Sequence, residues 1–141
     1  MAVMDIGEIP LFSMLRGRLG YLTERQRVVA QNVANSDTPG YVPTDLRPFS
    51  FRAQMQAQAG ATVQSVTQPG HMVSPSARRG AAAGVKVVEK KDSETTLDGN
   101  SVVLEEEMLK MADARMNYDA AISFYQKSLG LLRMAARRPG Q

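Results

Sequence analysis

The chain has little of the side-chain chemistry on which many enzymes depend. Its 141 residues contain no cysteine, no tryptophan and a single histidine, His71. The lack of cysteine excludes disulfide bonds, a thiolate nucleophile and cysteine-ligated zinc, and one histidine excludes any site that needs two. His71 lies in a stretch rich in Gly, Pro and Ser with no carboxylate near it in the sequence, so we expect an exposed loop histidine rather than a general base.

No other candidate active site is visible. The sequence contains no phosphate-binding loop and no metal-ligand spacing. Glu105, Glu106 and Glu107 are consecutive on an expected helix, where successive side chains diverge by about 100°, so they cannot form a paired acid and base. We therefore expect a protein that is not an enzyme and that holds no cofactor and no metal.

Charge of one sign is not concentrated in any part of the chain. Seventeen Lys and Arg face fourteen Asp and Glu, a net charge of +3. A nucleic-acid-binding protein gathers its basic residues on one face or arm. Here the cluster of Arg16, Arg18, Arg25 and Arg27 is interrupted by Glu24 and lacks interleaved aromatic residues. We expect no nucleic-acid partner.

Long apolar runs are also missing. No run approaches the roughly 20 residues that span a bilayer, so we expect no direct membrane insertion. The first ten residues carry Asp5 and Glu8 and no basic segment, so we expect no cleaved signal peptide. Taken alone, these features predict a cytoplasmic protein.

Heptad spacing predicts a helix over residues 11–35. Apolar residues recur at alternating steps of three and four, with Gln26 as the one polar exception, which is the a/d pattern of a coiled coil. Gly17 and Gly20 lie off this pattern and each costs about 1 kcal/mol relative to Ala, so the helix needs a partner. We name the apolar positions the N-terminal seam: Phe12, Leu15, Leu19, Leu22, Val29 and Val33.

A second helix is predicted over residues 101–136. Its apolar residues also step by four and three, with Arg115 as the polar exception. Glutamates lie in the first turns of this segment and arginines in the last turns, an arrangement that complements the helix dipole. Pro139 and Gly140 follow, and both residues are typical of helix ends. The C-terminal seam consists of Leu104, Met108, Met111, Tyr118, Ile122, Tyr125, Leu129 and Leu132.

The middle of the chain differs from both ends. Residues 57–84 are rich in Ala, Gly, Gln, Ser, Thr and Pro and cannot bury enough surface to offset their ordering entropy, so we expect them to be flexible. Val85, Val87 and Val88 indicate a short strand, and residues 97–100 a turn. The predicted fold is mainly α, with long N- and C-terminal helices (residues 1–40 and 101–141) pairing as a coiled coil around a flexible middle segment with a short β element (residues 41–100).

Two helices cannot enclose a core, and isolated helices are marginal in water. We therefore expect further helices to come from other chains. A three- or four-helix bundle whose remaining helices look like loops is the alternative.

The segment that follows the first helix carries strong turn signals. Asn35 is able to end the helix in the left-handed conformation that Asn tolerates. Pro39 and Gly40 fit the two central positions of a type II turn. An ordinary loop that ends a helix would show the same signals.

The same residues carry a resemblance. The pattern Asn32, Val33, Ala34, Asn35, then Thr38, Pro39, Gly40 and Tyr41 after two residues resembles the signature of the flagellar rod, hook and hook-associated axial proteins. Residues 97–102, Leu104, Glu105, Glu107 and Met108 are similar to the opening of the C-terminal helix in the proximal-rod members. One position departs from the pattern: Val103 stands where the family often has a helix-capping Asp, and we expect Asn100 or Ser101 to cap instead.

The resemblance implies a structural subunit of the flagellar basal-body rod whose terminal helices pair and pack with neighbouring subunits. The implied partners are other copies of the chain, other rod proteins, a basal-body ring adaptor and the flagellar export apparatus. The implied location is the rod, periplasmic in a two-membrane cell, after export without a cleaved signal peptide. A coiled-coil adaptor or chaperone-like helical protein is the alternative, because it would use the same heptads.

Overall fold

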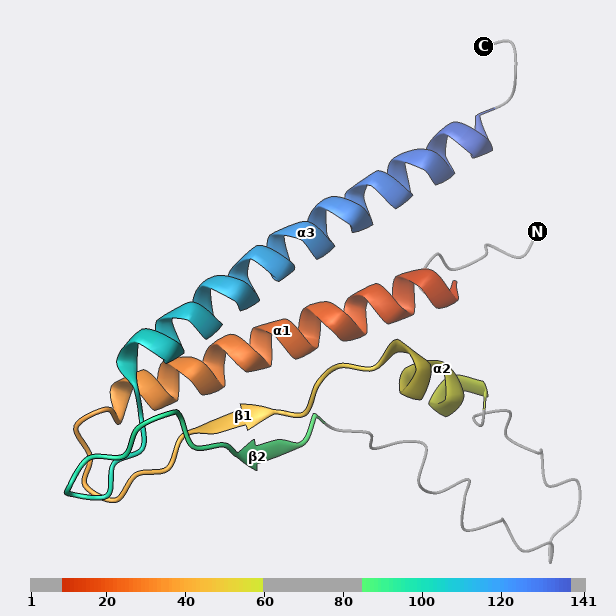
Figure 1. The fold of residues 1–141 in the computed structure, drawn as a ribbon. Helices are drawn as coiled ribbons and strands as arrows, with labels where there is room; N and C mark the ends of the chain where they lie inside the picture. Colours follow the sequence, from red (N-terminus) through yellow and green to blue (C-terminus); the bar gives the residue numbers. More distant parts are fainter. Residues whose placement is uncertain (1–8, 60–84, 138–141) are drawn as a thin grey trace, which may run out of the picture.

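The computed structural model describes residues 9–59 and 85–137. In chain order the elements are α1 (Pro10–Ala34), β1 (Thr44–Leu46), α2 (Phe51–Ala59), β2 (Val87–Glu89) and α3 (Leu104–Ala136) (Figure 1). The prediction of a mainly helical chain with long terminal helices and a short β element between them is confirmed. His71, most of the segment predicted to be flexible, and the stop signals at Pro139 and Gly140 lie outside the described residues.

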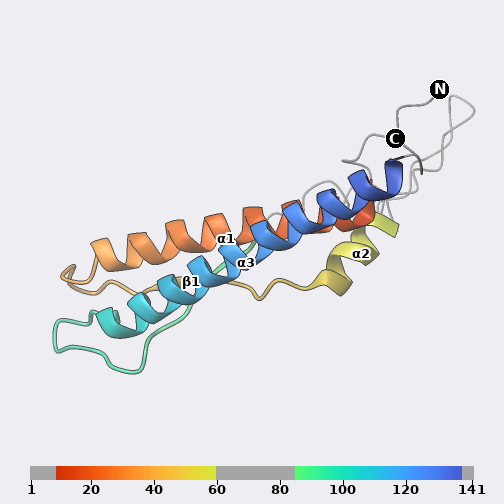
Figure 2. The same cartoon turned by 90° about the horizontal axis from the view of Figure 1, so that it is seen from above.

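Helices α1 and α3 lie side by side and antiparallel in both views (Figures 1 and 2). The end of α1 and the start of α3 lie together, and we call this the closed end of the hairpin. On α3 the residues buried against the rest of the chain recur every seventh position: Glu107, Ala114, Ala121 and Ser128. Because three of these four side chains are small, the larger side chains of α1, such as Phe12 and Leu22, fit against α3.

The two strands form an antiparallel ribbon beside α1. Thr44 pairs with Glu89 and Leu46 pairs with Val87. The predicted strand near residues 85–88 is found at 87–89, and its partner β1 was not predicted. The sequence of β1 is only three residues long, which is too short to show an alternating pattern.

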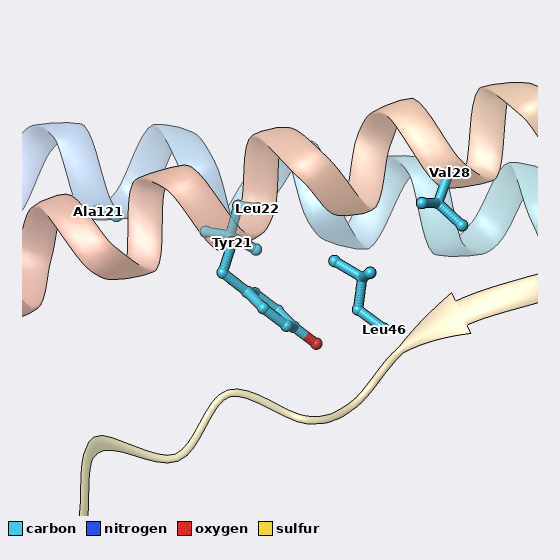
Figure 3. Close-up of a cluster of buried hydrophobic side chains, with 5 residues drawn as sticks. All are labelled: Tyr21, Leu22, Val28, Leu46 and Ala121. Atoms are coloured by element: carbon cyan, nitrogen blue, oxygen red, sulfur yellow. The ribbon is translucent and has the colours of Figure 1, made fainter. Parts of the chain in front are cut away.

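Strand β1 packs against a cluster of buried apolar side chains. Figure 3 shows Leu46 rising from β1 toward α1, while Tyr21 points from α1 to the segment that follows the strand. Leu22, Val28 and Ala121 complete this cluster. The core therefore lies between α1, α3 and the strand, and the outer side of α3 takes no part in it.

Helix α2 was also not predicted, since its neighbourhood was assigned to the flexible middle segment. It lies near the start of α1, where Gly17 leaves room for Gln54 of α2. A β-carbon at Gly17 would collide with the amide of Gln54. The glycine that weakens α1 as an isolated helix thus admits a neighbouring element.

Candidate functional site

The turn after α1 has the predicted geometry. Gly40 has a φ of 70°, and the Tyr41 N–H donates to the Thr38 carbonyl over 3.2 Å, which is the closing hydrogen bond of a β-turn. The expectation for Asn35 was wrong. Its φ is −104° and not left-handed, because its side chain donates back to the Gln31 carbonyl at 2.8 Å and holds it against the last helical turn.

This turn docks onto a second glycine turn, which precedes α3. The Gly40 N–H donates to the Asp98 carbonyl at 2.9 Å, and the Asn100 amide donates to the Thr38 carbonyl at 2.7 Å. Gly99 has a φ of 85°, and a β-carbon on it would lie 3.4 Å from the Gly40 Cα. The two backbones therefore approach closely at the one place where neither residue carries a side chain.

Asn32 is the centre of the closed end. Its side chain is fully buried and uses its whole hydrogen-bonding capacity. The amide nitrogen donates to the Thr44 carbonyl at 2.7 Å and to the Glu107 carboxylate at 2.8 Å. The amide oxygen accepts from the Thr44 N–H and from the Tyr41 hydroxyl, each at 3.0 Å. One side chain of α1 thus holds the strand, the turn and α3 together.

Glu107 continues these contacts into a charged group. The Lys110 ammonium lies 2.5 Å from one Glu107 oxygen and 2.6 Å from Asp92. Burial alone would lower the pKa of Lys110, but its hydrogen bonds to Asp92 and Glu107 raise that pKa above the ordinary value. Burial, and then the negative charge of Glu107, raises the pKa of Tyr41. We call Asn32, Tyr41, Asp92, Glu107 and Lys110 the polar network.

A residue of the polar network also holds the N-terminus of α3. The prediction that Asn100 or Ser101 would cap this helix was wrong. Neither Asn100 nor Ser101 caps the helix; Val103 is the residue at the cap and forms no side-chain cap hydrogen bond. Instead Asp92, eleven residues earlier, accepts from the Val103 N–H at 2.9 Å. Asn100 cannot do so because its oxygen accepts from the Val102 N–H and its amide holds the turn after α1.

A second ion pair fixes β1 to the helices. The Arg25 guanidinium of α1 lies 3.2 Å from the buried Asp45 of β1 and 3.1 Å from the exposed Asp113 of α3. Burial alone would lower the pKa of Arg25, but the hydrogen bond to Asp45 raises that pKa above its ordinary value. Arg25 therefore stays protonated. Two nitrogens of the planar Arg25 guanidinium donate to the two carboxylate oxygens of Asp45, which is the strong bidentate form of this ion pair.

The residues of the two predicted seams lie at different depths. In α1, Phe12, Leu15, Leu22 and Val29 are buried, while Leu19 and Val33 are half-buried. In α3, Met111, Tyr118, Ile122, Tyr125 and Leu129 are half-buried, while Leu104, Met108 and Leu132 are exposed. The C-terminal seam is therefore only partly buried within one chain. That its residues pack against neighbouring subunits stays a prediction. Arg115, its polar exception, is exposed and needs no buried partner.

Several residues of the polar network were not singled out from the sequence. Asp92 gave no signal, and Glu107 was assigned to an acidic helix start. The signal that could have found Glu107 is its spacing of seven from Ala114, Ala121 and Ser128, which places it on the inner face of α3.

The arrangement holds distant segments of the chain together. Every buried side-chain nitrogen and oxygen of the described residues has a hydrogen-bond partner. Within residues 9–59 and 85–137 no group of three or more acidic or histidine side chains could hold a metal ion. None of the helices in these ranges is long and apolar enough to cross a bilayer.

Comparison with known proteins finds several relatives of the same name. No protein-family model matches the chain. It is 31% identical to the flagellar basal body rod protein FlgB of Agrobacterium fabrum, over 92% of this chain and 95% of that protein. It is 29% identical to FlgB of Escherichia coli and 25% identical to FlgB of Salmonella typhimurium, each over 74% of this chain and 77% of the other.

Proposed function

Because the chain belongs to the family of flagellar basal body rod proteins FlgB, we propose that it polymerises through its paired terminal helices into the proximal part of the rod. Its role is that of a structural subunit of the rod. The observation that carries this conclusion is the extent of the similarity, which spans 92% of the chain and 95% of a rod protein.

The surface of the hairpin supports assembly. Large apolar side chains remain exposed along α3, and soluble monomers rarely leave so many in one region. They are Leu104, Met108, Leu109, Met116, Phe124, Leu131, Leu132 and Met134. Methionine packs against surfaces of different shapes, which suits a subunit whose neighbours are not all equivalent.

The polar network has a defined part in this proposal. It fixes the direction of the chain after α1, so that residues 41–59 always leave the closed end at the same angle. A subunit of a regular tube needs such a fixed shape, because each neighbour docks on the same surface. The partners we propose are further copies, other rod proteins, a basal-body ring adaptor and the flagellar export apparatus.

We place the protein in the basal-body rod, in the periplasm of a two-membrane cell, after export without a cleaved signal peptide. We assign it no catalytic activity. This location replaces the cytoplasmic one predicted from composition alone, and family membership is the reason for preferring it.

The test is deletion of the encoding gene in its own bacterium, followed by complementation with a tagged copy. We expect the deletion strain to be non-motile and to lack the rod in isolated basal bodies seen by electron microscopy. Complementation should restore both, with the tagged chain present in the basal bodies. Complete rods without the chain, together with a stable cytoplasmic complex that contains it, would identify a coiled-coil adaptor or chaperone instead.

A further inference from the structure

Leu97 is an apolar side chain that the fold itself does not use. It lies completely exposed at the tip of the turn before α3. That turn is held at both ends, because the Gly99 N–H donates to the Thr96 carbonyl at 2.9 Å and the Thr96 N–H donates to the Asn100 carbonyl at 2.8 Å. Its docking on Gly40 fixes it further. The closed end therefore presents one leucine in a fixed position.

A negative charge lies directly beside this leucine. Asp98 follows it directly and is exposed. Hydrogen bonds from the Thr96 hydroxyl and the Asn100 N–H lower the pKa of Asp98, so its carboxylate is ionised at neutral pH. The same connection also carries the exposed Lys90, Lys91 and Glu94, farther along the chain from Leu97. A surface that receives Leu97 should be apolar and should carry a cation at its rim.

Such a surface exists at the other end of the molecule. A hollow of about 260 Å³ lies between the start of α1, the start of α2 and the second half of α3. Leu11, Leu15, Arg18, Phe51, Ala121 and Phe124 line it. A cavity of about 150 Å³ accepts a benzene ring, so this hollow has room for the side chain of a leucine.

The hollow also has the required cation. The Arg18 guanidinium lies over the rings of Phe49 and Phe51, 6.0 Å and 5.7 Å from their centres. Its hydrogen bond to the Asn117 amide oxygen is long, at 3.4 Å, and among the described residues it forms no ion pair with a carboxylate. Arg18 is thus available to face an acidic group brought by another molecule.

The two features cannot meet within one chain. The turn before α3 lies at the closed end, whereas α2 lies near the start of α1 (Figure 1). The side chains that line the hollow come from the end where α1 starts. From Arg18, the lining residue of α1 nearest the closed end, the helix runs on to Ala34, a separation of about 24 Å at 1.5 Å per residue. We propose that Leu97 of one copy inserts into this hollow on a second copy, with Asp98 facing Arg18. The inference rests on the proposed function and names one contact by which the subunits join.

This contact is of the head-to-tail kind. Each copy presents a leucine at one end and a hollow at the other, so the interaction leaves both a free leucine and a free hollow for the next copies. Contacts of this kind build closed rings or open helical assemblies rather than two-fold dimers. The geometry therefore suits a subunit that joins several copies of itself.

Cross-linking in assembled basal bodies tests the contact, because the chain has no cysteine of its own. A double variant, Leu97→Cys with Leu11→Cys, is treated with a short bismaleimide in isolated basal bodies. We expect a covalent dimer and higher multimers of the chain. The matched control pairs Met116→Cys, 70% exposed on α3, with Leu11→Cys. Its yield should be at least about tenfold lower, because only a seated pair reaches a millimolar effective concentration.

The outcomes separate the contact from the proposed function. Absence of the wild-type chain from basal bodies would overturn the proposed function. Incorporation of the double variant with cross-linking no better than the control would overturn the contact alone. A cross-link from position 97 to a different rod protein would overturn it as well. Should Leu11→Cys prevent incorporation, Phe124→Cys replaces it on the opposite wall of the hollow, with the same expectation.

Discussion

Replacing Asn32 by leucine should destabilise the hairpin more than any other single change at the closed end. Leucine has the same number of side-chain heavy atoms and the same branching but makes none of the four hydrogen bonds of Asn32. The Glu107 carboxylate keeps Lys110 but loses its second partner, while the Thr44 backbone and the Tyr41 hydroxyl lose theirs. A lost bond to a charged group costs about 1.5–3 kcal/mol and a neutral one about 1 kcal/mol.

The expected loss in the free energy of unfolding is therefore about 3–5 kcal/mol, since the neighbouring losses do not add fully. Small domains are stable by only about 5–15 kcal/mol, so a large share of the total stability would disappear. Urea unfolding of the full chain followed by circular dichroism measures the change. The matched control is Asn35→Ala, which removes two exposed side-chain hydrogen bonds and should cost only about 1 kcal/mol, because water replaces them.

A second substitution checks the reason for the loss. Asn32→Asp keeps the shape but places a carboxylate against the Glu107 carboxylate, and a buried acid beside a like charge has a raised pKa. Raising the pH through the carboxyl range should therefore weaken this variant, and lowering it should restore part of the stability relative to wild type. If Asn32→Leu unfolds at the wild-type urea concentration, Asn32 is not the centre of the closed end and the reasoning fails.

Four further outcomes are expected. Gly40→Val should cost about 1–3 kcal/mol, because a β-branched residue resists a φ of 70°, and should stop rod assembly while secretion continues; normal rods would make the turn an ordinary loop. Leu129→Asp should abolish incorporation and motility at normal protein level, since burying an unpaired carboxylate costs several kcal/mol; a motile strain would refute this seam position. Gly20→Ala should raise the free energy of unfolding by up to about 1 kcal/mol, having nothing within 4 Å, and Gly17→Ala should gain less because Gln54 must move; equal gains would contradict this. The pKa of Lys110 is raised, so its stabilising charge is present below its ordinary value of 10.5 and is lost as the pH rises through the raised value. The stability difference between wild type and Lys110→Met should shrink over that rise, and a constant difference in urea unfolding would argue against the network.

The long helices were predictable because their signal is local and repeated. The expected range of 11–35 became Pro10–Ala34, and 101–136 became Leu104–Ala136. A helix of this length repeats its pattern many times, so one glycine or one arginine does not hide it. The turn at Gly40 was predictable for a similar reason, since Pro followed by Gly restricts the backbone to few conformations.

The face that α3 turns toward α1 was not predictable in the same way. A search for large apolar residues selects Leu104 and Met108, which are exposed, and passes over Ala114 and Ala121, which are buried. Small residues bring two helices close together, yet they add little to an apolar pattern. The strand β1 and the helix α2 were missed because their placement depends on contacts with α1, which the local sequence does not contain.

Residues of the polar network are far apart in the chain, and this has a consequence for when the closed end is able to form. Asn32 and Glu107 are separated by 75 positions, and Lys110 comes later still. Closing a loop of that size costs about 4 kcal/mol of chain entropy before any of these hydrogen bonds is made. A chain that leaves a narrow passage with its N-terminus first cannot complete the network until residue 110 has emerged. Folding of this end is thus postponed by topology until at least the first 110 of the 141 residues are free.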